Sequence, residues 1–193
     1  MAPNMIYYTQ EMREDGTKSM KYHKVKHPRK IVKVMRDFIN VAHGLTYGEN
    51  NCNVDCGLRK LSEVNFCSCF DPVAPNTFWI GYNFGTLEDK QTRETYKNFI
   101  ERFPSGRGFA TITLILLHEI GHAYHPRSSF ENYDKEEAME EIYEIANTQV
   151  ECQKLYMKLP DEYAATDWAI NWLKDPEHRK IAKRFEKQFF ECY

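Results

Sequence analysis

Hydrophobic and polar positions follow two different periods along the chain. In the first 28 residues, two short runs of strand-type composition, around Tyr7 and Tyr22, flank an Asp15-Gly16 pair. This arrangement predicts an N-terminal β-hairpin, because Asp-Gly favours a tight turn between two strands. Hydrophobic residues then recur every three or four positions from 29 to 43, which is typical of an amphipathic helix, and Gly44 predicts its end.

The rest of the chain predicts a small sheet followed by helices. Residues 48–85 are rich in Asn, Gly, Cys and Pro, and their most strand-like pieces are Val64–Phe70 and Thr77–Phe84. Helical periods then cover residues 90–103, 108–124, 134–159, 160–173 and 177–189. We therefore expect one α+β domain over residues 1–193, mostly helical, with a small antiparallel sheet beside the 108–124 helix.

Composition and charge narrow the classes of function. The chain has 193 residues and a formal net charge of −2, which argues against a general polyanion-binding protein. It shows no secretory signal, and its longest apolar run is too short to cross a membrane, so we expect a cytoplasmic protein without a membrane partner. A basic cluster between Lys18 and Arg36 raises the alternative of nucleic-acid binding, but we favour a solvated face.

The strongest chemical signal is His118-Glu119-Ile120-Gly121-His122, which reads H-E-x-x-H inside an apolar run. Residues four apart share one face of a helix, so His118 and His122 can offer two imidazole nitrogens to one zinc ion. Glu119 lies about 100° round the helix. From there it can take a proton from a metal-activated water without being a ligand itself.

A catalytic zinc ion usually has three protein ligands, so a third group must come from elsewhere. His125 lies about 10 Å along the helix from His118, too far for one ion while the helix stays regular. A better candidate is Glu162, in the pattern Glu162-x-x-Ala165-x-x-Trp168-Ala169, whose small residues let one helix approach another. The acidic stretch before it offers further alternatives, namely Glu140, Glu141, Glu144 and Glu151.

These two patterns together resemble the ImmA/IrrE-like zinc metallopeptidases. That family pairs an apolar run and an HExxH helix with a downstream Glu-x-x-Ala-x-x-aromatic-Ala helix, and the resemblance covers roughly residues 107–173. It implies a zincin-like fold, Zn²⁺ held by His118, His122 and Glu162, Glu119 as the base, and a protein or peptide substrate. The chain departs from the family in the long acidic segment 134–159 between the two patterns.

Other residues near the motif have candidate supporting roles. Asp167 is the carboxylate nearest in sequence to Glu162 and could hold a ligating imidazole by its other nitrogen. Donors that could stabilise an oxyanion are Tyr163, Tyr124 and His125. Gly121 costs helix stability, so it indicates either close approach of another backbone to the site or tight packing between helices.

Four cysteines, Cys52, Cys56, Cys67 and Cys69, lie close in sequence. They could hold a second, structural zinc ion, although free reduced thiols are the favoured interpretation. Peptide deformylases combine HExxH with an upstream cysteine ligand, but the sequence around Cys67 does not resemble theirs.

The sequence therefore predicts a zinc metallopeptidase that hydrolyses peptide bonds. The alternative of another class is a catalytically weak zincin-fold module that binds or regulates a partner. A nucleic-acid-associated protein is the third and weakest alternative.

Overall fold

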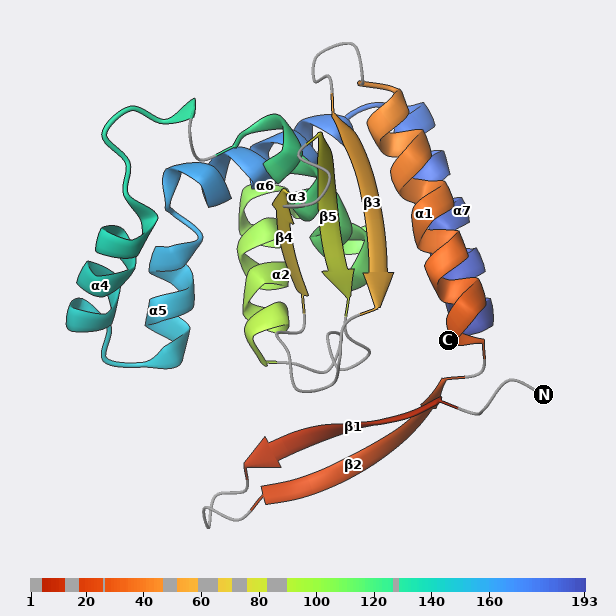
Figure 1. The fold of residues 1–193 in the computed structure, drawn as a ribbon, viewed down its shortest axis with the longest axis horizontal. Coiled ribbons are helices and arrows are strands. Elements are labelled where there is room, and N and C mark those ends of the chain that lie inside the picture. The colour runs from red at the N-terminus through yellow and green to blue at the C-terminus, as the bar shows by residue number, and fades with distance from the viewer. Residues whose placement is uncertain are drawn as a thin grey trace.

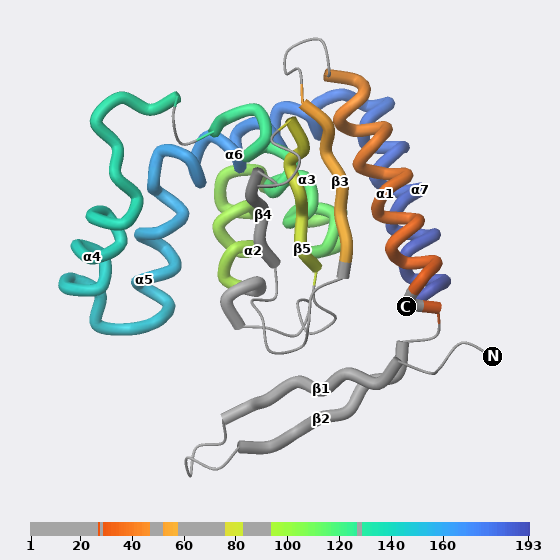
Figure 2. The backbone as a smooth tube through the Cα atoms, viewed as in Figure 1, coloured from red at the N-terminus to blue at the C-terminus, as the bar shows by residue number. Residues whose placement is uncertain are grey.

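The computed structural model describes residues 5–12, 18–25, 27–46, 52–58, 66–70, 76–82, 90–126 and 129–193. For residues 5–12, 18–25, 28, 58, 66–70 and 90–93 it describes the backbone alone. Figure 2 follows the chain from its N-terminus to its C-terminus. The described part is mostly helical and carries two small sheets, which makes it an α+β protein.

The two sheets differ in their pairing. Strand β1 (Met5–Met12) pairs antiparallel with β2 (Lys18–Val25). The second sheet has the order β3-β5-β4, formed by Asn53–Leu58, Thr77–Tyr82 and Phe66–Phe70 respectively. Strand β4 runs antiparallel to β5, but β3 runs parallel to it. The prediction of a purely antiparallel sheet is therefore wrong, because it did not include β3.

The composition of strand β3 is not typical of strands, so the sequence does not predict it. Its outward positions are Asn53, Asp55 and Gly57, residue types that are depleted in strands. Val54 and Cys56 alternate with these positions and are buried in the core, with exposed fractions of 6% and 1%. Two buried side chains in alternate positions are too short a pattern to distinguish a strand from a loop.

The helices before and after the sheet lie close to their predicted positions. Helix α1 spans Pro28–Gly44, α2 spans Lys90–Arg102, α3 spans Thr111–Tyr124, α6 spans Pro160–Trp172 and α7 spans Pro176–Cys192. A 3-10 turn at Pro104–Gly108 separates α2 from α3. Within the described residues, no helix is both long and apolar enough to cross a membrane.

The predicted long helix over residues 134–159 is two helices, α4 (Lys135–Ile145) and α5 (Gln149–Tyr156). The helix is interrupted before Thr148, because Thr148 is the N-cap of α5. Its hydroxyl accepts a hydrogen bond from the backbone N–H of Glu151. The Glu151 carboxylate in turn accepts from the N–H of Asn147. This Thr-x-x-Glu capping pattern is visible in the sequence and marks the start of α5.

Helix α3 lies at the centre of the fold. It contacts β4 and β5 on one face of the sheet and packs against α2 and α6 on its other sides (Figure 1). Its residues from Ile112 to His118 are all buried, which explains the unbroken apolar run in the sequence. Helix α1 lies next to β3, and α7 packs along α1, where Phe38 stacks on Phe185 with ring centroids 4.3 Å apart.

The N-terminus of α3 is capped by a side chain from the last helix. Ala110, its N-cap residue, has no capping side chain of its own. Instead the Glu186 carboxylate on α7 accepts hydrogen bonds from the Ala110 N–H at 2.5 Å and from the Thr113 hydroxyl at 2.8 Å. A carboxylate at this place also interacts favourably with the helix dipole. Lys183 forms an ion pair with Glu186 at 2.7 Å.

The basic cluster between Lys18 and Arg36 was predicted to be a solvated face. The structure describes the side chains of this cluster only in α1. There Lys33 pairs with Asp37 at 2.6 Å, and Arg36 pairs with Asp55 at 2.7 Å. The lysine side chains of β2 lie outside the described part. Two of the basic groups thus already have acidic partners, which does not favour a phosphate-binding surface.

Candidate metal centre

The motif histidines come from the C-terminal half of α3 and face the same way. The imidazole rings of His118 and His122 lie one helical turn apart, with centroids separated by 4.8 Å. His118 is buried, with 4% of its side chain exposed, whereas His122 retains 14%. The pair thus lies at the boundary between the core and an accessible edge.

Helix α6 brings Glu162 to the two imidazoles because it packs unusually close to α3. A Cβ atom added at Gly121 would lie 2.5 Å from the carbonyl oxygen of Ala165 and 2.9 Å from its Cα. The absent side chain therefore allows the two backbones to meet. The two interpretations of Gly121, tight packing between helices and close approach of a backbone to the site, are therefore compatible, because the tight packing brings the α6 backbone to the site.

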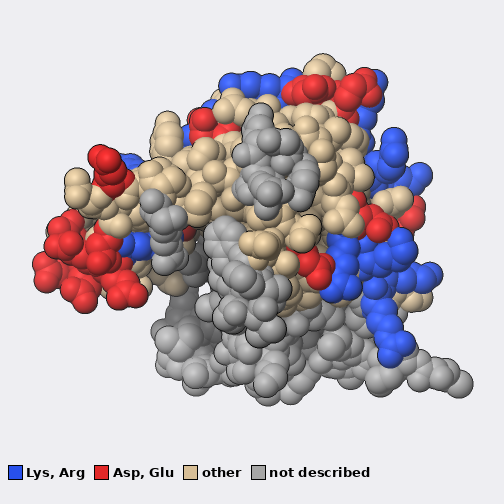
Figure 3. Space-filling view, turned by 45° about the horizontal axis from the view of Figure 1, so that its top comes forward, with Lys and Arg blue, Asp and Glu red and all other residues tan. Residues whose placement is uncertain are grey.

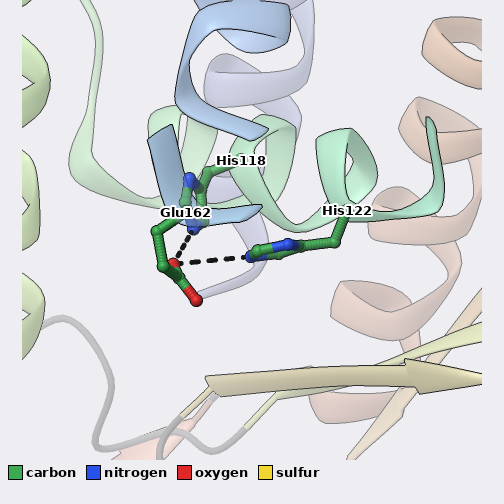
Figure 4. A group of neighbouring side chains, drawn as sticks. All are labelled: His118, His122 and Glu162. Carbon is green, nitrogen blue, oxygen red and sulfur yellow. Dashed lines mark hydrogen bonds and ion pairs between the residues drawn. The ribbon is translucent and has the colours of Figure 1, made fainter. Parts of the chain in front are cut away.

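The three predicted ligands form one compact group (Figure 4). Glu162 Oε2 lies 3.0 Å from His118 Nε2 and 3.5 Å from His122 Nε2. The candidate ligand atoms all lie within 4.8 Å of one another, and only 3% of the Glu162 side chain is exposed. The group could hold a metal ion.

The spacing of these atoms can be compared with a real coordination sphere. A tetrahedral zinc ion with bonds of about 2.0–2.2 Å places its ligand atoms about 3.3–3.6 Å apart. The two measured separations from Glu162 Oε2 lie within a few tenths of an ångström of this range. Two imidazole nitrogens and one carboxylate oxygen are also a donor set that suits zinc. The residues present therefore fit a divalent ion.

The second nitrogen of His118 is held by a neighbour on α6. His118 Nδ1 lies 3.0 Å from the Thr166 hydroxyl oxygen, and that hydroxyl donates to the Glu162 carbonyl oxygen at 3.0 Å. The hydroxyl therefore accepts from Nδ1–H, and Nε2 is the nitrogen that faces Glu162 Oε2. Thr166 thus has the role predicted for Asp167, which is exposed and pairs with Arg102 at 3.1 Å.

The second oxygen of Glu162 has partners that the sequence did not indicate. Lys135 Nζ lies 2.5 Å from Glu162 Oε1, and the Tyr156 hydroxyl donates to the same oxygen. Lys135 also pairs with Asp161 at 2.6 Å, and Asp161 accepts from the Tyr133 hydroxyl at 2.7 Å. Lys135, Tyr156 and Asp161 lie on three different helices, and Tyr133 precedes α4, so no single helical period indicates them as a group.

Charge on the site depends on the imidazole–carboxylate pair. Burial lowers the pKa of His122, but the attraction and hydrogen bond of Glu162 and the charge of Glu119 together outweigh it, so this pKa lies above its ordinary value. Burial raises the pKa of Glu162, whereas His122 and His118 lower it, and the net result lies well below its ordinary value. The carboxylate is therefore charged, and a divalent cation competes with a proton for His122.

Glu119 lies beside the group rather than within it. Its side chain is half-buried, and its charge acts on His122, whose pKa it helps to raise. It also adds to the raised pKa of Tyr156, after burial and Glu162, so its charge acts on groups on both sides of Glu162. The position suits a group that handles protons next to a metal ion.

The alternative third ligands lie elsewhere. Glu140, Glu141 and Glu144 are exposed on α4, in an acidic region at the end of the molecule that α4 occupies (Figure 3). Glu151 is exposed and serves the N-terminus of α5. His125 follows α3 and is not one of the grouped ligands. Burial lowers its pKa, and Asp167 and His122 are the charges that act on it.

Two of the proposed oxyanion donors have other partners. The Tyr124 hydroxyl bonds with His43 Nδ1 at 2.9 Å and accepts from the Thr46 hydroxyl at 2.5 Å. Tyr163 is half-exposed, and the Arg102 guanidinium lies 3.7 Å from its ring centroid. These contacts place neither tyrosine hydroxyl beside His118 or His122.

The structure describes the side chains of only two of the four cysteines that were considered for a second zinc site. Cys52 and Cys56 are buried free thiols of the hydrophobic core. Burial and the neighbouring Asp55 raise the pKa of Cys56 to about 12, so its thiol is neutral at physiological pH. The side chains of Cys67 and Cys69 lie outside the described residues, and the second zinc site stays a prediction.

Gly121→Ala is expected to destabilise the protein and weaken metal binding. The new methyl group meets the Ala165 backbone, which cannot turn aside as a side chain can. Overpacking of this kind costs about 1–3 kcal/mol. This corresponds to a melting temperature lower by about 2–12 °C for a chain of this size. Differential scanning calorimetry and zinc titration measure the two effects.

Gly44→Ala is the matched control, because a Cβ atom at that helix position meets nothing within 4 Å. Equal melting temperatures and zinc affinities for the two variants would contradict the argument that Gly121 sets the distance between α3 and α6.

We expect metal binding at this group to raise the thermal stability of the wild-type protein. A ligand that binds only the folded state at 100 times its Kd adds about 2.7 kcal/mol, or about 5–10 °C in this size range. Melting curves with a strong chelator and with added zinc measure the shift. The Glu162→Ala variant should show little of it, and an equal shift in that variant would place the stabilising ion elsewhere.

No protein-family model, curated protein or solved structure matches the chain.

Proposed function

We propose that this protein is a zinc metallopeptidase with a zincin-type domain, similar to the ImmA/IrrE-like family. One observation carries the proposal: two imidazoles and one carboxylate, from two helices, meet with their ligand atoms within 4.8 Å, and Glu119 follows His118 on α3. The H-E-x-x-H spacing accounts for the histidines and Glu119, and the predicted downstream helix supplies Glu162.

The choice of zinc rests on the donor atoms and their number. Two imidazole nitrogens and a carboxylate oxygen form the three-ligand set of several zinc hydrolases, which keep a further position for water or substrate. Magnesium and calcium prefer oxygen ligands, which this group supplies only once. Two of the three ligands are almost fully buried, and this burial excludes water from their side of the site.

The accessible side of the group is the side where chemistry would occur. His122 is the most exposed ligand, and Glu119 is half-buried on the same helix. When bound, zinc supplies a Lewis acid that makes water acidic near neutral pH and polarises a carbonyl group. Glu119 would accept the proton from the attacking water and return it to the leaving amine.

The proposal is tested with protein that has been stripped of metal and then reloaded. An unfolded, alkylated protein serves as the substrate, and mass spectrometry identifies new peptide termini after incubation. Zinc-loaded protein should produce cleavage that a chelator abolishes and that magnesium does not restore. Absence of new termini with one zinc bound per chain would contradict the proposed activity.

A further inference from the structure

The segment between the two motif helices sends one side chain from each of its helices to the candidate metal centre. Lys135 is the first residue of α4, and Tyr156 is the last residue of α5. Both contact Oε1 of Glu162. The acidic segment 134–159, which departs from the family pattern, thus reaches the third ligand from both of its ends.

Lys135 is held so that its ammonium group has a fixed place. Its three N–H donors face Glu162 Oε1 at 2.5 Å, Asp161 Oδ2 at 2.6 Å and the Tyr156 hydroxyl oxygen at 3.3 Å. The lysine side chain is only 9% exposed, and Asp161 and Glu162 are 1% and 3% exposed. Asp161 is itself anchored by the Tyr133 hydroxyl. A buried ammonium with every donor satisfied does not move freely.

The contacts divide the Glu162 carboxylate into two differently used oxygens. Oε1 receives both Lys135 and Tyr156, whereas Oε2 faces the imidazoles of His118 and His122. Figure 4 shows this asymmetry, with one oxygen between the two rings and the other turned away. An unrestrained carboxylate can bind a cation through one oxygen or through both.

We infer that Lys135 and Tyr156 are positioning residues that restrict Glu162 to binding a metal ion through Oε2 alone. The inference rests on the proposed zinc site. The lysine also forms ion pairs with both of the adjacent buried carboxylates, Asp161 and Glu162. Outer partners of this kind orient metal ligands and set the affinity of the site.

Lys135→Met and Tyr156→Phe test the inference, with Lys154→Met as the control, because Lys154 is an exposed lysine on α5. Competition with a chromophoric chelator measures the zinc Kd. Loss of such an outer partner typically weakens binding about 10–100-fold, which we expect for Lys135→Met, with a smaller loss for Tyr156→Phe. The control should bind as wild type does.

Visible absorption of the Co²⁺-substituted proteins gives the second measurement. Four-coordinate cobalt absorbs more strongly than cobalt of higher coordination number. If Glu162 gains freedom to bind through both oxygens, the bands of Lys135→Met and Tyr156→Phe should weaken and shift, whereas those of Lys154→Met should not. A merely structural role of Lys135 would lower stability without this spectral change.

The outcomes are separable. Zinc Kd values within twofold of wild type, with unchanged cobalt spectra in both variants, would overturn the inference. If Lys135→Met does not fold, Tyr156→Phe decides alone, because it removes a single oxygen atom. Wild-type protein that binds both ions but cleaves no peptide contradicts only the proposed function. Wild-type protein that binds neither ion contradicts both.

Discussion

Glu119→Gln is expected to reduce peptide hydrolysis by about 10²–10⁴-fold, which is the usual contribution of a positioned general base. The amide has nearly the size of the carboxylate but cannot accept the proton from water. Because Glu119 is not among the three grouped ligands, the variant should still bind one zinc ion per chain. Initial rates on the alkylated protein substrate and zinc content, both at saturating zinc, measure these two properties.

Glu144→Gln makes the same chemical change on the exposed face of α4 and should retain the wild-type rate. Wild-type turnover by metal-loaded Glu119→Gln would show that another group accepts the proton. If wild type and variant both bind zinc and neither cleaves, the alternative of a zincin-fold binding module gains support.

Glu162→Ala is expected to remove zinc from the purified protein. Two imidazoles remain, and one of three ligands is lost. The affinity should fall by more than the roughly 10–100-fold that loss of an outer partner costs. Elemental analysis of the variant and wild type, purified side by side, gives zinc per chain. Calorimetry shows whether the variant is folded. We expect that it is, since Lys135 retains its ion pair with Asp161.

Glu140→Ala, on the exposed face of α4, is the control for this experiment and should retain one zinc. One zinc per chain in folded Glu162→Ala would refute Glu162 as the required third ligand. A second zinc in wild type that survives the substitution would direct attention to the cysteines around Cys52 and Cys67.

The parts of this protein that the sequence predicted well depend on regular periods. A helix repeats every 3.6 residues, so the four-residue spacing of His118 and His122 alone places them on one face. The grouping of Glu162 with them follows from its place on a helix whose Ala165 permits close packing against Gly121. Such features are visible because they are local or depend on small residues.

The missed parts depend on contacts between distant residues. Lys135 lies 27 positions before Glu162, on a helix whose composition indicates only an acidic surface. Asp167 was predicted in place of Thr166, because a carboxylate is the more familiar partner for a ligating imidazole. The geometry of α6 decides between these neighbours, and only Thr166 turns toward His118.

The cap that Glu186 provides for α3 affects how the protein is made. The carboxylate that satisfies the Ala110 N–H lies 76 residues further along the chain. A ribosome therefore synthesises the HExxH helix long before the group that completes its first turn. Any product that terminates before residue 186 lacks this cap and also the contact between the Phe185 and Phe189 rings. An early termination product therefore leaves the N-terminus of α3 without this carboxylate.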